Sequence, residues 1–167
     1  ELEMRASPWD GGFISFDIGV LNSDYKNFLI PDLNDLSAAP RDASNTDIKN
    51  RTPDWTFTAS VEHAFLLANG ATLTPQLGVY SQDDYEWGTD VPGDVSPNCH
   101  QDSYAKWRFR TTYGPQVGNW QASLFGYNIT DEEILYRCGG NRGGSYKTLH
   151  QAPSQWGAEF TMNFGGN

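Results

Sequence analysis

Three cationic side chains recur at every second position of one segment: Lys106, Arg108 and Arg110. Successive side chains of a β-strand point to opposite faces, so a strand here would place all three on one face. A row of cations in a narrow interior of low dielectric can attract an anionic ligand, but charges withdrawn from water also need structural partners. The acids that could pair with the row are Glu62, Asp84 and Glu159. We expect structural pairing, with anion binding as the alternative role.

The chain contains two cysteines, Cys99 and Cys138, which fall in successive long loops. An even count in an oxidising compartment favours a disulfide that links these loops. The alternatives are two separate thiols, or pairing with another part of a longer protein. Together with His100 and His150 the cysteines could ligate zinc, but the chain lacks the tight Cys-x-x-Cys and His-x-x-x-His spacings of such sites. We therefore expect a disulfide and no bound metal.

Motifs that carry catalysis are not found in the sequence. It contains no Gly-x-Ser-x-Gly, no His-Glu-x-x-His, and no phosphate-binding or dinucleotide-binding loop. The carboxylate pairs Asp83-Asp84 and Glu132-Glu133 do not converge, because adjacent strand residues point to opposite faces. The net charge of −10 argues against nucleic acid as a partner. We expect no enzymatic activity, no cofactor and no nucleic-acid partner.

Strands must position these side chains, and the end of the chain shows the strand pattern most clearly. Within 155–164, polar residues alternate with Trp156, Ala158, Phe160, Met162 and Phe164. Period-two alternation is typical of a strand with one apolar face, and it recurs in the segments 13–22, 55–67, 104–113 and 120–127. With an N-terminal stub at 1–5 and the segment 71–85, the sequence predicts an all-β antiparallel up-and-down meander of about seven strands.

Two local signals refine the expected strands and turns. Asn69-Gly70 suits a type I′ turn, in which both central residues have positive φ. Pro75 lies inside a predicted strand and has no N–H to donate to the ladder. We expect a bulge or a local break in pairing at Pro75.

The connections between the predicted strands alternate in length. Tight links at 7–11, 68–70 and 114–118 alternate with long ones at 26–53, 86–102 and 130–154. Short turns on one rim and long loops on the other are characteristic of outer-membrane barrels. No segment approaches the ~18 consecutive apolar residues of a membrane helix.

The aromatic residues then separate into two belts. The long-loop rim carries Trp55, Trp107 and Trp156, and the short-turn rim carries Phe65, Tyr113, Trp120 and Phe164. Two aromatic girdles at the membrane interfaces are typical of a transmembrane barrel. On this interpretation the apolar face contacts lipid, and the cationic row faces the lumen.

Three segments carry a resemblance to a known family. The segment 127–133 resembles the element that follows the penultimate strand of TonB-dependent outer-membrane receptors, and its motif residues are Asn128, Asp131 and Glu132. The segment 50–55 resembles a loop-to-strand transition of that family, and 155–164 resembles its C-terminal strand. As a departure, Gly165-Gly166-Asn167 follow Phe164, whereas chains of the family usually end on the aromatic residue.

The resemblance implies a 22-stranded barrel in the bacterial outer membrane, occluded by an N-terminal plug, that takes up scarce ligands such as iron–siderophore complexes, cobalamin or oligosaccharides. This chain would be the C-terminal part of that barrel, with the plug and earlier strands absent. Its partners would be outer-membrane lipid, the rest of the barrel and plug, the small-molecule ligand, and the assembly machinery that recognises the C-terminal strand. The plug would then be a further partner for the cationic row.

Two other classes of protein fit parts of the same pattern. In a soluble β-sandwich that binds carbohydrate, the apolar faces would meet as a core and aromatic loop residues would grip a sugar. A porin-like barrel without a plug would have the same strands and girdles. Partition into detergent would separate the sandwich from the membrane protein.

Overall fold

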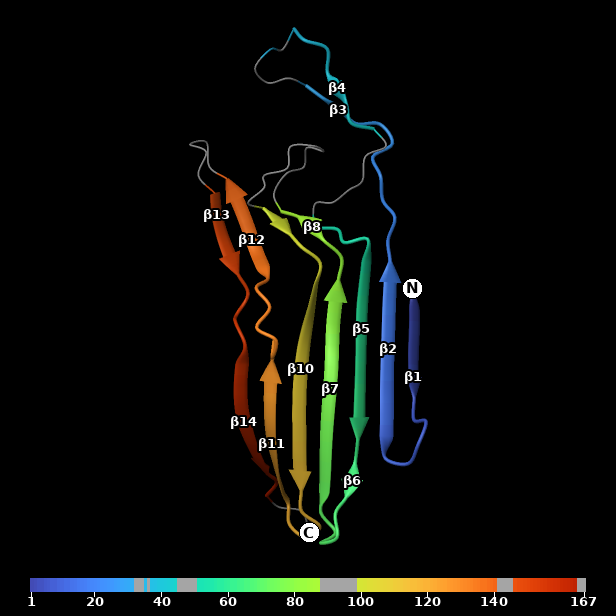
Figure 1. The fold of residues 1–167 in the computed structure, drawn as a ribbon, viewed down its shortest axis with the longest axis vertical. Coiled ribbons are helices and arrows are strands. Elements are labelled where there is room, and N and C mark those ends of the chain that lie inside the picture. Colours follow the sequence, from blue (N-terminus) through green and yellow to red (C-terminus); the bar gives the residue numbers. More distant parts are fainter. Residues whose placement is uncertain (32–34, 36, 45–50, 88–98, 141–145, 165–167) are drawn as a thin grey trace.

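The computed structural model describes residues 1–31, 35, 37–44, 51–87, 99–140 and 146–164. The described residues contain no helix with the length and apolar character needed to cross a bilayer. Seven strands follow one another in a single antiparallel sheet: β1 (Leu2–Ala6), β2 (Gly12–Val20), β5 (Trp55–His63), β7 (Thr72–Gln82), β10 (Tyr104–Gly114), β11 (Trp120–Tyr127) and β14 (Gln155–Met162). The expected all-β antiparallel meander is therefore confirmed (Figure 1).

The edges of this sheet are β1 and β14, and no sheet among the described residues closes on itself. A short strand, β6 (Phe65–Leu66), pairs with β7 just beyond the end of β5. The last strand ends at Met162, so Phe164, expected as its terminal aromatic residue, lies two positions beyond it. Two features of the family resemblance involve residues that the structure does not describe. They are the loop-to-strand segment 50–55, since 45–50 lie outside the described residues, and the tail 165–167.

The strand register gives the sheet one apolar and one polar face, since residues directly opposite each other share a face. One apolar row crosses the sheet through Ile14, Val61, Leu77, Phe109, Gly126 and Trp156. The adjacent polar row crosses through Ser15, Ser60, Gly78, Arg108, Tyr127 and Gln155. The alternation seen along each strand is thus maintained across the whole sheet.

The apolar face is not covered by a second layer of the described residues. Leu124 is 60% exposed, Trp156 65% and Phe160 63%, although all three belong to strands of the sheet. Among the described residues, the most deeply buried side chain is that of Ile134, which lies outside the sheet and packs with Tyr85 and Tyr104. Burial is therefore concentrated in the loops, and the strands leave large apolar surfaces open.

The long connections contain small two-stranded sheets that the sequence pattern did not predict. They are β3 (Leu29–Ile30) with β4 (Arg41–Asp42), β8 (Tyr85–Glu86) with β9 (His100–Gln101), and β12 (Leu135–Gly140) with β13 (Tyr146–His150). All three lie beyond the same end of the main sheet, and the tight turns lie at the other end (Figure 1). Their strands are too short, or too irregular in polarity, to show a period of two.

The type I′ turn predicted at Asn69-Gly70 is wrong. Gly70 has a φ of 77°, but Asn69 is not among the residues with positive φ. The Gly70 N–H donates to the Leu67 carbonyl at 2.8 Å, and the Leu67 N–H donates to the Ala71 carbonyl at 2.8 Å. This is a three-residue loop whose final glycine supplies the left-handed conformation. The Asn69 Oδ1 accepts from the Ala71 N–H at 3.1 Å, which adds a side-chain contact within this loop.

Pro75 coincides with a break in pairing on one side of β7. The β5–β7 ladder ends at Glu62 and Gln76, and pairing resumes between Phe65 and Leu73 in the same register. On the other side Pro75 pairs with Thr111 in an uninterrupted ladder. The expected local break is therefore present, and the unchanged register excludes a bulge.

Candidate ligand site

Lys106, Arg108 and Arg110 lie on the polar face of β10, opposite Tyr80, Gly78 and Gln76 of β7. Trp107 and Phe109 occupy the intervening positions on the apolar face. The row predicted from the sequence is therefore a row in the folded sheet as well. Its three members nevertheless differ in their contacts.

Arg110 is held by groups of the sheet itself. Its Nη2 donates to Glu159 Oε1 and to Ser123 Oγ, each at 3.1 Å. Its guanidinium also lies over the Phe125 ring, 5.7 Å from the centroid. Half-exposed ion pairs of this kind contribute only about 0 to 1 kcal/mol, so the pair with Glu159 mainly fixes the orientation and neutralises the charge. Arg110 thus has the structural role expected for the row.

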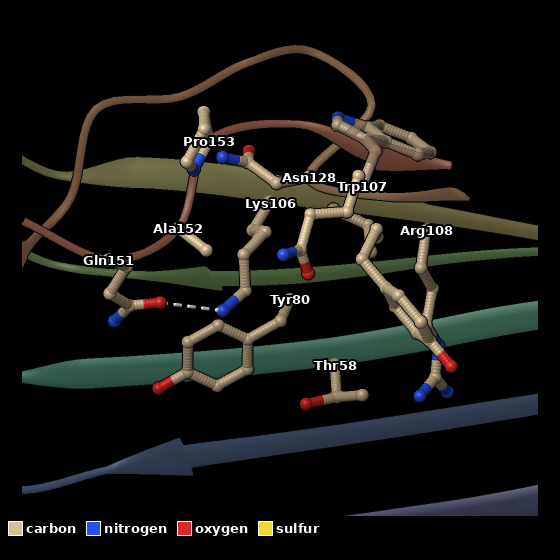
Figure 2. A pocket seen from close by; sticks show the side chains of 12 residues that line it. Thr58, Tyr80, Lys106, Trp107, Arg108, Asn128, Gln151, Ala152 and Pro153 are labelled. Carbon is tan, nitrogen blue, oxygen red and sulfur yellow. Dashed lines mark hydrogen bonds between the residues drawn. The ribbon is translucent and has the colours of Figure 1, made fainter. Parts of the chain in front are cut away.

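Lys106 and Arg108 have no such counterion among the residues that the structure describes. The Lys106 Nζ donates to the neutral Gln151 Oε1 at 3.0 Å (Figure 2). Arg108 lies across Gly78, where an added Cβ would come within 2.7 Å of the Arg108 Nε. Within the described part of the chain, neither cation makes an ion pair. The expectation of structural pairing therefore does not extend to these two residues.

These two cations line a concave pocket of about 450 Å³ at the long-loop end of the sheet. Its lining is formed by Thr58, Val79, Tyr80, Lys106, Trp107, Arg108, Tyr127, Asn128, Gln151, Ala152, Pro153 and Gln155. The set contains hydroxyl and amide groups and no carboxylate (Figure 2). Such a pocket can hold a polar, negatively charged ligand through charge-assisted hydrogen bonds.

The loop after β11 brings the far wall of the pocket into place. Asn128 is buried, with a φ of 49°, and its side chain accepts from the Glu132 N–H and donates to the Glu132 carbonyl, both at 2.9 Å. Asp131, with a φ of 56°, accepts from the Ser154 N–H at 2.8 Å. Asparagine and aspartate tolerate the left-handed conformation better than other residues with a side chain. Asn128 and Asp131 therefore shape this loop through their side chains, whereas Glu132 takes part through its backbone.

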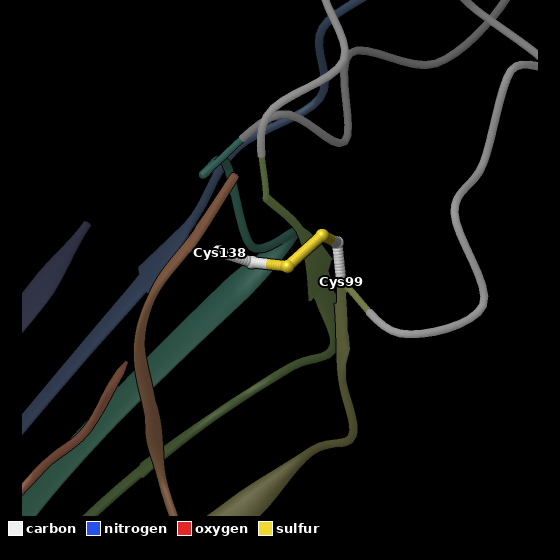
Figure 3. The surroundings of a disulfide bond; sticks show 2 residues. All are labelled: Cys99 and Cys138. Atoms are coloured by element: carbon white, nitrogen blue, oxygen red, sulfur yellow. A yellow bond between two sulfur atoms is a disulfide. The ribbon is translucent and has the colours of Figure 1, made fainter. Parts of the chain in front are cut away.

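The disulfide predicted between Cys99 and Cys138 is present in the structure, with a Cα–Cα distance of 5.4 Å (Figure 3). Both cysteines are buried with Leu135 against Trp87, so the bond joins β12 to the segment before β9. The zinc site considered with His100 and His150 is wrong, because the two sulfurs are bonded to each other. The described residues contain no cluster of ligands suited to a metal ion.

His100 belongs to an acidic cluster beside this disulfide. Its Nδ1 lies 2.8 Å from Glu86 Oε1, and its Nε2 lies 3.2 Å from Asp102 Oδ1. The hydrogen bond to Glu86 raises the pKa of His100 above 6.5, aided by the charges of Glu86, Asp102 and Asp84, and burial opposes the shift. A raised pKa means that the pair stabilises the folded loop fully below the ordinary pKa and loses this contribution as pH rises through the raised value.

We predict that Glu86→Gln lowers the pKa of His100 toward 6.5, because it removes the main hydrogen-bonding acceptor. Asp102→Asn removes only a smaller electrostatic contribution and serves as the control. NMR titration of the His100 ring protons in the detergent-solubilised chain measures both shifts. An unchanged pKa in the Glu86→Gln variant would contradict the pairing.

Several residues of the pocket were not candidates from the sequence: Thr58, Tyr80, Tyr127, Gln151 and Gln155. Strand register places four of them next to the cationic row, and Gln151 lies in the loop between β13 and β14. The alternation in β5, β7 and β11 assigns Thr58, Tyr80 and Tyr127 to the polar face. Gln151 carries no comparable local signal, because its position depends on the loop after β11.

Comparison of the chain with protein-family models, with curated proteins and with solved structures found no match. The function is accordingly inferred from the geometry and chemistry of this sheet, its pocket and its loops.

Proposed function

We propose that this chain is a wall segment of a bacterial outer-membrane β-barrel receptor that takes up a small ligand. The observation that carries the proposal is a single sheet of seven consecutive strands with one apolar face that no described element covers. In water such a face is costly, at roughly 25 cal/mol for each Å² of exposed apolar surface. Contact with lipid removes this cost.

The lengths of the strands support a transmembrane position. The strands β7 and β10 each contain 11 residues. At about 3.3 Å per residue they extend about 36 Å, and a tilt of about 45° reduces the height to about 25 Å. This matches the apolar band of an outer-membrane barrel.

The arrangement of aromatic rings supports the same position. Near the tight turns, Trp120 stacks on Phe160 with ring centroids 5.6 Å apart, and Tyr113 lies 5.8 Å from Trp120. Trp156 and Trp107 lie on the apolar face closer to the long loops. Rings at these two heights fit the two interfaces of a bilayer.

The receptor class rests on the motif after β11 and on the open sheet edges. Unpaired strand edges are not tolerated in lipid, so β1 and β14 need neighbouring strands from elsewhere in a barrel. The motif around Asn128 and Asp131 resembles TonB-dependent receptors, in which a 22-stranded barrel encloses a plug. The uncompensated cations on the polar face would then line the lumen, where a ligand passes.

The first test is the behaviour of the complete chain in solution. We expect it to aggregate in plain buffer and to become monodisperse in detergent, because the apolar face needs cover. Size-exclusion chromatography with light scattering, with and without detergent, measures this. A monodisperse monomer that unfolds cooperatively in plain buffer would contradict the proposal and would favour the soluble carbohydrate-binding sandwich.

A further inference from the structure

The three cations of β10 are not equivalent, and we infer that Lys106 and Arg108 form a binding site for a small ligand with at least two carboxylate groups. Arg110 is excluded from this site because Glu159 and Ser123 already engage its guanidinium. The inference names the ligand chemistry of the proposed receptor, and it rests on that proposal for the role of binding in uptake.

The charge of the pocket points to an anion. The chain contains 21 acidic residues against 11 basic ones, yet no acid is among the described residues that line this pocket. An acid-rich protein that keeps carboxylates away from two neighbouring cations leaves a local positive potential, which a concave surface focuses. An occupant that carries negative charge would complement this site.

The spacing of the cations points to a ligand with two anionic groups. Lys106 and Arg108 are two positions apart on one strand, so their backbone positions differ by about 7 Å. A compact ion such as phosphate can engage one of them closely, whereas a ligand with two carboxylates can engage both. Arginine adds a planar fork that accepts a carboxylate through two parallel hydrogen bonds.

The neighbours of the two cations hold them in position. Gln151 orients the Lys106 ammonium through a neutral acceptor, which leaves the charge uncompensated. Gly78 provides the space in which the Arg108 side chain crosses the sheet, since a Cβ at this position would displace the Nε. Tyr127 lies directly opposite Arg108 and lines the same pocket.

The test is an NMR titration of the detergent-solubilised chain at low ionic strength with succinate, acetate and inorganic phosphate as probes. We expect saturable shifts at Arg108 and Lys106 and tightest binding of succinate. Lys106→Gln and Arg108→Gln should each weaken succinate binding about tenfold, because each removes one charge-assisted contact. Arg110→Gln, on the same strand and face, should change it less than twofold.

A second variant separates position from charge. Gly78→Ala keeps both cations but displaces the Arg108 side chain, so it should also weaken succinate binding. Added salt should weaken succinate binding in every variant that retains a cation, because salt screens the charges. Equal losses for Arg108→Gln and Arg110→Gln, or acetate or phosphate binding as tightly as succinate, would overturn the inference. The need for detergent is measured in a separate experiment. A chain that is soluble without detergent would contradict the proposed function, but it would not change the result of the titration.

Discussion

Replacement of Leu77 by arginine is expected to prevent assembly of the sheet in a bilayer. Leu77 lies near the middle of β7 on the apolar face, between Val61 and Phe109 of the neighbouring strands. An arginine on a lipid-facing position near the membrane midplane costs about 2 to 4 kcal/mol. Heat-modifiable mobility of the complete barrel that contains this chain, after refolding into lipid vesicles, reports the assembled fraction.

The adjacent position supplies the control for this experiment. Gln76 points to the polar face, and its Nε2 lies 3.3 Å from Glu62 Oε2. Gln76→Arg places the same charge one residue away, with a carboxylate in reach, and should assemble normally. Normal assembly of Leu77→Arg together with failure of Gln76→Arg would show that the polar face contacts lipid.

Removal of the disulfide is expected to open the loop cluster and to leave the main sheet unchanged. Cys99 and Cys138 are 39 positions apart, and closing a loop of this length corresponds to about 4 kcal/mol in the chain-entropy model. The bond joins β12 to the segment that precedes β9, both outside the main sheet. The stabilisation therefore belongs to the loops.

Hydrogen exchange measures this difference directly. In Cys99→Ser/Cys138→Ser, the Trp87 N–H, which donates to the Cys99 carbonyl at 2.8 Å, should exchange much faster than in the parent chain. The amides that pair β7 with β10 should be unaffected. The single variants Cys99→Ser and Cys138→Ser should have the same effect, because each removes the same bond. Faster exchange throughout β7 and β10 would instead assign the disulfide a role in the stability of the whole sheet.

The seven main strands and their two faces were predictable because the signal is local. In β14, for example, apolar and polar residues alternate over eight positions, and this pattern depends only on near neighbours in the chain. The disulfide could also be predicted from the sequence, since the chain has only two cysteines and both fall in long loops. The alternative of a zinc site was wrong because cysteines and histidines that are not closely spaced in the sequence do not indicate which of them lie together in the folded protein.

Register and loop geometry were decided by the tertiary structure. Lys106, Arg108 and Arg110 are equivalent in the sequence, and only pairing across β11 and β14 brings Glu159 to Arg110 and leaves the other two facing a pocket. Gln151 reaches Lys106 across 45 positions because Asn128 and Asp131 shape the loop between them.

The turn at Asn69-Gly70 illustrates the same limit at short range. Its residue types fit both a type I′ turn and a three-residue loop. The hydrogen bonds that close the ends of the neighbouring strands select the three-residue loop. The sequence by itself therefore determined which segments form the seven main strands and which of their side chains share a face, since both follow from the geometry of one extended chain. The tertiary structure determined which charges are neutralised and where a pocket forms, because these depend on contacts between segments far apart in the chain.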